Sequence, residues 1–283
     1  MRKTFSRTGL IIAMSLLVSI ASCSGSENDL RSTNLPDGLG FDDPQASPDP
    51  GRYDSAQRIR DPQPSLVEAP KLQTPKVPLG ERITLNTSDG VRIAATVYNA
   101  DGDSGVILVH MIGKDRKSWD PIITNIATKR SVIAIDLRGH GQSGGILRKF
   151  SDDDYRAMVN DVAAARQALG KKEIAIVGAS IGANAAIKYA SSDPSVKTVI
   201  ALSPGLDYHG LRIDDVIPYL DRPILVVASM GDQYSYNTMR KLSEMNKRAE
   251  TDTLSGDKHG TDMFGTGKGV ESEIFRWIDA LLG

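Results

Sequence analysis

The residues best suited to do chemistry lie in the segment Gly178-Ala179-Ser180-Ile181-Gly182. An apolar run with β-branched side chains precedes this segment and indicates a buried strand, and an alanine-rich, helix-favouring run follows it. A Gly-x-Ser-x-Gly pattern between a strand and a helix is typical of a sharp turn that presents a nucleophilic serine. Ser180 would then stand above the sheet edge, with the amide of Ile181 facing a developing oxyanion. The alternative is a strand-to-helix turn with no chemical function.

A serine hydroxyl needs a general base, and the chain contains four histidines. His110 precedes the serine and stands where an oxyanion loop would begin. His140 lies in a glycine-rich turn, and His209 lies in an excursion between two predicted strands. His259 follows the last predicted strand, which fits the chain order serine, acid, histidine. We therefore predict His259 as the base, the alternative being a surface loop histidine.

The acid that orients this base should follow a strand at the same edge of the sheet. Asp232 comes just after the predicted strand 223–228 and precedes His259. It is the predicted acid, although Gly-Asp is also a common turn pair. Asp207, after the preceding strand, is the reserve candidate.

A second oxyanion donor should come from the loop after the predicted strand 105–110. The amide of either Met111 or Ile112 could join that of Ile181 there, and the sequence does not decide between them. Such a donor contributes about 3–4 kcal/mol of transition-state stabilisation.

The elements that position these residues alternate between strands and helices. A hairpin opens the series, with strands at 82–87 and 91–98 around Ser88-Asp89-Gly90. Further strands are predicted at 105–110, 131–136, 173–177, 196–202, 223–228 and 251–254, and helices after Asp120 and at 152–169, 181–189, 235–247 and 270–281. This order predicts an α/β fold with a mostly parallel central sheet and helices on both faces.

The first residues resemble an export signal. Positive charges at Arg2, Lys3 and Arg7 precede an apolar run, residues 10–20, that is too short to span a bilayer comfortably. The junction Ile20-Ala21-Ser22-Cys23 is similar to a bacterial lipobox, in which cleavage precedes a cysteine that becomes lipid-modified. We predict a signal peptide at 1–22 and lipidation of Cys23, the alternative being an ordinary signal peptide with an incidental cysteine.

Residues 23–78 are predicted to be a disordered linker. This stretch is dense in Pro, Asp, Ser, Gln and Gly and has few clustered apolar residues, so it cannot bury enough surface to offset chain entropy. The predicted globular domain covers 79–283. It would be tethered in the cell envelope, facing the periplasm or the exterior.

Composition excludes some classes of function. The net charge of −1 and the aromatic content of 5% give no basis for nucleic-acid binding. With a single cysteine the chain has no intrachain disulfide and no cysteine metal cluster. We expect no cofactor and no metal.

From Leu79 to Leu282 the chain resembles the α/β-hydrolase superfamily. The resemblance lies in His110-Met111, the turn 136–143 (Asp-Leu-Arg-Gly-His-Gly-Gln-Ser), the Ser180 segment, Gly231-Asp232 and His259-Gly260. The chain looks most like small dienelactone-hydrolase-like members, from which it departs by a serine instead of a cysteine at 180 and by Met111 instead of a glycine.

That resemblance implies several further features. His140 is a structural element of its turn. The tract 203–221, where many relatives insert a cap, holds one short amphipathic piece at 211–220, so no sizeable cap domain is expected.

The expected function is a lipid-anchored, exported serine hydrolase that cleaves a small carboxylic ester by a Ser-His-Asp acyl-enzyme mechanism. A peptidase or amidase would share these residues, and a non-catalytic envelope binding protein would share the fold. The sequence leaves the natural ester, the membrane leaflet and the oligomeric state open.

Overall fold

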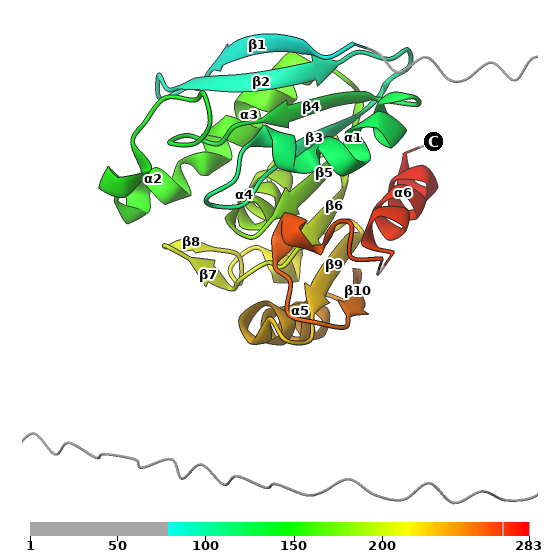
Figure 1. The fold of residues 1–283 in the computed structure, drawn as a ribbon. Helices are drawn as coiled ribbons and strands as arrows, with labels where there is room; N and C mark the ends of the chain where they lie inside the picture. The colour runs from blue at the N-terminus through cyan, green and yellow to red at the C-terminus, as the bar shows by residue number, and fades with distance from the viewer. Residues whose placement is uncertain (1–78, 268, 283) are drawn as a thin grey trace, which may run out of the picture. The chain divides into compact units, whose positions relative to one another are not determined.

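Eight strands form one sheet within residues 79–267 and 269–282, the part of the chain that this computed structural model describes (Figure 1). They are β1 (Glu81–Asn86), β2 (Arg92–Tyr98), β3 (Ser104–Val109), β4 (Ser131–Ile135), β5 (Glu173–Ala179), β6 (Val196–Leu202), β9 (Ile224–Ser229) and β10 (Ala249–Leu254), in the order β1-β2-β4-β3-β5-β6-β9-β10. β2 pairs antiparallel with β1 and β4, and all other pairs are parallel. The predicted mostly parallel sheet is confirmed.

The predicted signal peptide, Cys23 and the linker 23–78 lie outside the described residues and stay predictions. None of the helices in the described part is long and apolar enough to cross a membrane.

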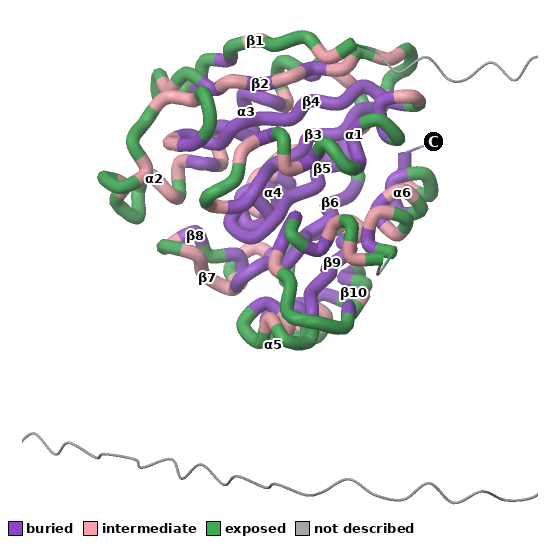
Figure 2. Tube along the Cα trace, in the orientation of Figure 1, coloured by how far each residue is buried: buried purple, intermediate pink, exposed green. Residues whose placement is uncertain are grey.

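Helices cover both faces of the sheet. They are α1 (Asp120–Ala127), α2 (Asp152–Arg156), α3 (Met158–Leu169), α4 (Ile181–Ala190), α5 (Gln233–Met245) and α6 (Val270–Leu281). Apolar residues of α3, α4 and α5 share one buried cluster, and those of α1 and α6 share the cluster on the other face. Because both faces are covered, the central strands are buried along their length, whereas β1 at the edge is largely exposed (Figure 2).

The helix predicted at 152–169 is two helices that meet at Ala157. Ser151 and Asp154 form a capping box that begins α2. At the break, the amide of Asn160 donates to the carbonyl of Ala157, three residues earlier, which is the spacing of a 3-10 helix. α2 reaches the tract after β6, where Tyr155 stacks on His209 at 4.2 Å, while α3 packs on the sheet. Periodicity could not show this break because Tyr155, Val159 and Val162 keep helical spacing across it.

The tract 203–221 carries a small ribbon and a turn. β7 (Asp207–Tyr208) pairs antiparallel with β8 (Leu211–Arg212), and a 3-10 turn follows at Ile217–Tyr219. The amphipathic piece expected at 211–220 is therefore half of this ribbon plus the turn.

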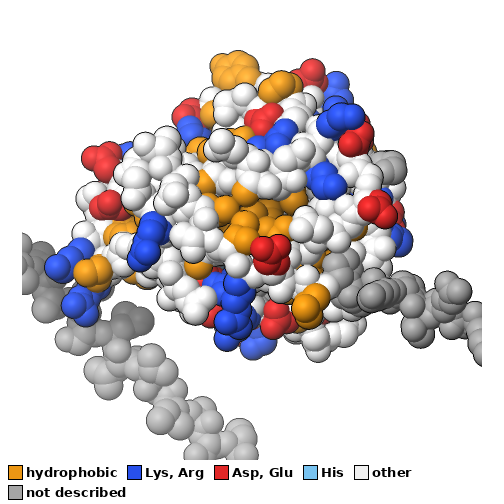
Figure 3. Space-filling view, turned by 90° about the horizontal axis from the view of Figure 1, so that it is seen from above, with side chains coloured by type: hydrophobic (Ala, Val, Ile, Leu, Met, Phe, Trp, Pro, Cys, Tyr) orange, Lys and Arg blue, Asp and Glu red, His pale blue; other side chains and the backbone are white. Residues whose placement is uncertain are grey.

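The surface of the molecule on the side of β1 is seen from above in Figure 3. Hydrophobic side chains gather at its centre, and charged side chains of both signs lie around them.

Strand β5 and helix α4 approach each other closely at two glycines. A Cβ on Gly178 would lie 2.5 Å from the carbonyl oxygen of Gly182, and one on Gly182 would lie 2.4 Å from that of Val109. Each opposing atom belongs to backbone, so it cannot move aside. Both positions therefore require glycine.

We predict that Gly182→Ala lowers the free energy of unfolding by about 3 kcal/mol, because the added methyl group overlaps the end of β3. Gly144→Ala is the matched control, since its Cβ would lie 3.4 Å from the nearest atom, an ordinary contact. That variant should stay within about 1 kcal/mol of the wild type in urea unfolding. Equal stabilities of the two variants would contradict the close approach.

Candidate active site

Ser180 stands at the tip of the turn between β5 and α4 with a strained backbone. Its φ is 55° and its ψ is −124°, a conformation that costs a non-glycine residue about 1–3 kcal/mol. The turn is held because the Ser180 amide donates to the carbonyl of Leu202 at 2.8 Å, and the Ser180 carbonyl accepts from Ala183 and Asn184. The predicted sharp turn is thus present, and it presents the serine at the carboxyl edge of the sheet.

Asp232 and His259 are in direct contact. Asp232 follows β9, His259 follows β10, and 2.6 Å separates the Asp232 Oδ2 from the His259 Nδ1. A carboxylate can only accept, so Nδ1 donates and the neutral ring presents Nε2 as an acceptor. Asp232 is also the N-cap of α5, where its Oδ1 accepts from the amide of Ser235. This cap explains why α5 begins at 233 rather than at the predicted 235.

Ser180 itself lies beside Tyr208, a residue that the sequence did not single out. Burial raises the pKa of the Tyr208 hydroxyl, the hydrogen bond with Ser235 and the nearby Ser180 hydroxyl oppose this rise, and the charge of Asp232 adds to it. The hydroxyl also donates to the carbonyl of Ser203 at 3.2 Å. Tyr208 therefore lies near both Ser180 and Asp232.

Among the described residues no hydrogen bond joins Ser180 to His259. In enzymes such a bond often tightens only when substrate is bound.

Ser203 fixes the loop that carries His259. It is buried with a φ of 50°, and its Oγ accepts from the amide of Gly260 at 3.0 Å. Its own amide donates to the carbonyl of Val227 at 2.7 Å. Neither Ser203 nor Tyr208 belongs to a motif, and both act through partners far away in the chain. Sequence patterns therefore held no signal for them. Asp207, the reserve acid, lies in β7 and bonds the amide of Gly210 through its side chain.

The loop after β3 is fixed by His110. The ring is fully buried, its Nδ1 bonds the carbonyl of Met111 at 2.8 Å, and its Nε2 accepts from the amide of Leu137 at 2.9 Å. Since the peptide bonds are trans, the amide of Ile112 points opposite to that carbonyl. The Met111 side chain packs at Gly260, whose Cβ would lie 2.5 Å from its sulfur. The predicted oxyanion loop and the His259 loop thus touch.

The turn after β4 is built around Asp136. This buried carboxylate accepts from the amides of Arg116 and Gln142, each at 2.8 Å, and pairs with the Arg116 guanidinium. A Cβ on Gly141 would overlap it, which explains the glycine there. His140 bonds the carbonyl of Arg138 through Nδ1, as a structural residue of the turn would. These motif residues hold the turn after β4 against the loop after β3.

Metal ligands are not grouped here. Within residues 79–267 and 269–282, no three His, Cys, Asp or Glu side chains are clustered so as to hold an ion.

Comparison with known proteins supports the fold. Residues 106–220 match the family model described as the alpha/beta hydrolase fold. This stretch contains Ser180 and the loop after β3 but ends before Asp232 and His259. A solved esterase from Pyrococcus furiosus superposes with a TM-score of 0.62 at 17% identity, covering 72% of this chain and 92% of the esterase.

Curated relatives match over shorter stretches. An uncharacterized protein of Mycobacterium tuberculosis is 30% identical over 124 residues, which is 44% of this chain and 35% of the relative. A 2-(acetamidomethylene)succinate hydrolase of Mesorhizobium japonicum is 26% identical over 112 residues, 39% of each chain. The chain thus spans well under half of the length of the curated relatives that it matches.

The environment of His110 predicts a pH dependence of stability. Burial lowers its pKa from 6.5 to about 4, so the folded protein binds fewer protons than the unfolded chain between these values. The stabilising contribution is complete above pH 6.5 and is lost as the pH falls toward 4, by at most about 3 kcal/mol. Urea unfolding across this range should show a shallower pH slope in His110→Gln than in the wild type. Identical slopes would contradict this prediction.

Proposed function

We propose that this chain, which belongs to the α/β-hydrolase superfamily, is a serine hydrolase that cleaves carboxylic esters. The observation that carries the proposal is the contact between Asp232 and His259 at the sheet edge where the strained Ser180 stands. The solved structures that share the fold include several esterases, which favours ester chemistry.

In this mechanism Ser180 Oγ attacks the acyl carbon and its proton passes to Nε2 of His259. The carboxylate of Asp232 holds the ring in the required tautomer and stabilises the imidazolium. His259 then returns the proton to the leaving alcohol oxygen, which departs as the acyl-enzyme forms. Water, deprotonated by His259, attacks the acyl-enzyme, and the acid is released as Ser180 regains its proton.

The oxyanion that forms in both steps needs two amide donors. Ile181 is the first residue of α4, so its amide has no acceptor within the helix. Ile112 is the better second donor, because the carbonyl of Met111 is bound to His110 and the Ile112 amide points the other way. We therefore assign the oxyanion hole to Ile181 and Ile112 in preference to Met111.

The catalytic roles are tested by labelling the protein with a fluorophosphonate and by turnover of phenyl acetate. Ser180→Ala should abolish the labelling, and both Ser180→Ala and His259→Ala should lower kcat by a factor on the order of a thousand or more. Ser191→Ala, at the exposed end of α4, is the matched control and should behave as the wild type. Labelling of Ser180→Ala at the wild-type rate would refute the mechanism.

The proposal includes export and a lipid anchor on Cys23, supported by the charged, apolar and lipobox-like order of residues 1–23. Cys23→Ala should shift the protein from the membrane fraction to the soluble envelope fraction, because the acyl chains that hold it are no longer attached. Ser24→Ala is the neighbouring control. Unchanged membrane retention of Cys23→Ala in cell fractionation would overturn the anchor.

A further inference from the structure

The segment that carries Tyr208 is fixed to helix α4. The side chain of Asn184, fully buried in that helix, donates to the carbonyls of Gly205 and Leu211, each at 2.8 Å. Its Oδ1 accepts from the amide of Gly205 at 3.2 Å. One side chain therefore holds both ends of the segment 205–211 and sets where Tyr208 lies relative to α4.

The ring of Tyr208 is held by packing. It is half-buried and lies edge to face against the ring of Tyr234, with 5.5 Å between the two ring centroids. A Cβ on Gly205 would lie 2.6 Å from the ring of Tyr234 and 2.7 Å from that of Tyr208, so both rings can approach only because this residue has no side chain. This packing fixes the direction in which the Tyr208 hydroxyl points.

The hydroxyl of Tyr208 joins two serines that lie far apart in the sequence. It donates to the carbonyl of Ser203 at 3.2 Å, and 3.3 Å separates it from the Oγ of Ser235. A carbonyl can only accept, so the phenolic proton points to Ser203 and the Ser235 hydroxyl donates to the phenolic oxygen. Because burial raises the pKa of Tyr208, the hydroxyl keeps its proton at neutral pH.

Each of these two serines also bonds the surroundings of one proposed catalytic group. The Oγ of Ser203 accepts from the amide of Gly260, the residue after the proposed base, at 3.0 Å. The amide of Ser235 donates to Oδ1 of Asp232, whose other oxygen contacts the base. The hydroxyl of Tyr208 thus connects the loop that carries the base to the turn that carries the acid.

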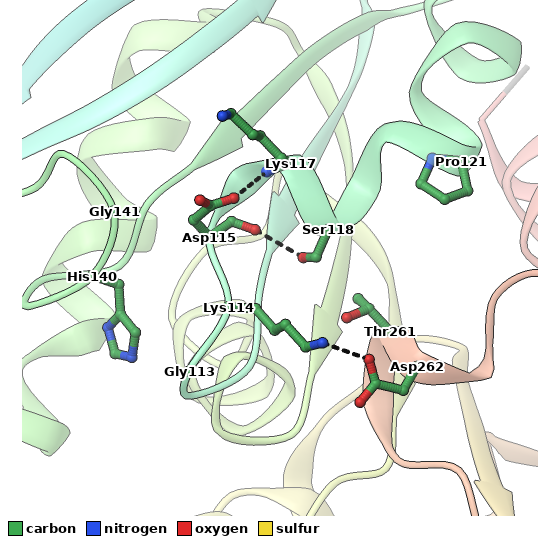
Figure 4. A pocket seen from close by; sticks show the side chains of 10 residues that line it. All are labelled: Gly113, Lys114, Asp115, Lys117, Ser118, Pro121, His140, Gly141, Thr261 and Asp262. Atoms are coloured by element: carbon green, nitrogen blue, oxygen red, sulfur yellow. Dashed lines mark hydrogen bonds and ion pairs between the residues drawn. The ribbon is translucent and has the colours of Figure 1, made fainter.

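The loop of His259 also borders a pocket of about 620 Å³ (Figure 4). This pocket lies between the loop after β3, the turn after β4 and the 3-10 helix at Gly260–Met263. Across it Lys114 pairs with Asp262 at 2.7 Å, and each of these side chains is at least 40% exposed. Exposed ion pairs are screened by solvent and hold a loop weakly. The buried bond from the Gly260 amide to Ser203 is therefore the firmer support of this loop.

We propose that Tyr208 is a positioning residue for ester hydrolysis, whose hydroxyl keeps the turn of Asp232 and the loop of His259 in the arrangement that proton transfer from Ser180 requires. Small displacements of reacting groups lower rates steeply, so a bond between their supports affects turnover. This inference rests on the proposed function and adds to it a residue outside the Ser-His-Asp set.

The test compares the full-length wild type with Tyr208→Phe, which removes the hydroxyl and keeps the ring. Turnover of phenyl acetate is measured per site titrated by the fluorophosphonate, so that inactive molecules are not counted. Tyr208→Phe should lower kcat about tenfold, the effect of one lost hydrogen bond. KM should stay within about twofold, because Tyr208 holds catalytic groups and does not bind the substrate.

Tyr234→Phe is the matched control. Its hydroxyl bonds the amide and the carbonyl of Asp207, in the same ribbon, at 3.1 and 2.8 Å. Both variants therefore remove one phenolic hydroxyl that holds the ribbon, but that of Tyr234 bonds neither Ser203 nor Ser235. Tyr234→Phe should keep kcat within about twofold of the wild type.

Ser235→Ala tests the same connection from its other end, since it leaves the backbone amide that bonds Asp232 in place. It should also lower kcat. The double variant of Tyr208→Phe and Ser235→Ala should be about as slow as Tyr208→Phe alone, because both substitutions break one connection.

The outcomes separate this inference from the proposed function. An unchanged kcat in Tyr208→Phe, or an equal loss in Tyr234→Phe, would overturn the positioning role. A raised KM with unchanged kcat would make Tyr208 a substrate contact and would also overturn it, as would effects that multiply in the double variant. In each of these cases Ser180-dependent turnover by the wild type leaves the serine mechanism standing. Absence of that turnover counts against the proposed function itself.

Discussion

The close crossing of β5 and α4 is the constraint on which the site depends. Because Gly178 and Gly182 have no side chains, the helix backbone packs directly on the ends of β3 and β5. At this crossing Ser180 has a positive φ of 55°, and the first amides of α4 lie at the sheet edge. The strain of about 1–3 kcal/mol is offset by burial of the apolar residues of α4 in the core.

Around this crossing, other groups hold the loops through bonds to backbone. Asp232 caps α5 with one oxygen and holds His259 with the other, so the helix fixes the carboxylate that orients the ring. Ser203 holds the loop of His259 because its Oγ accepts from the amide of Gly260. His110 holds the loop after β3 because its ring bonds the carbonyl of Met111, the residue before Ile112. The pocket occupies the gap between loops held in this way.

Local patterns predicted much of this arrangement. The strand and helix order followed from hydrophobic periodicity, and Asp232 and His259, chosen by chain order and strand ends, lie in contact. What the sequence missed depends on distant partners. Tyr208 acquires its place from a ribbon that pairs only in the folded chain, and the break at Ala157 depends on where α2 packs. The catalytic roles of the chosen residues remain predictions because contact alone does not establish chemistry.

The ribbon β7–β8 contributes no strand to the main sheet, yet it brings Tyr208 to the serine. Exposed side chains of the ribbon such as Arg212 can change during evolution without disturbing sheet register, but Leu211 is buried in the core and its carbonyl accepts from Asn184. A single methyl group at Gly178 or Gly182 cannot be accommodated. Proteins that descend from this chain would then differ in the exposed side chains of the ribbon, while the turn that carries Ser180 stayed constant. The fold thus separates a surface that can vary, on the ribbon, from a turn that cannot, between β5 and α4. Tyr208 belongs to the ribbon and lies near Ser180 in that turn.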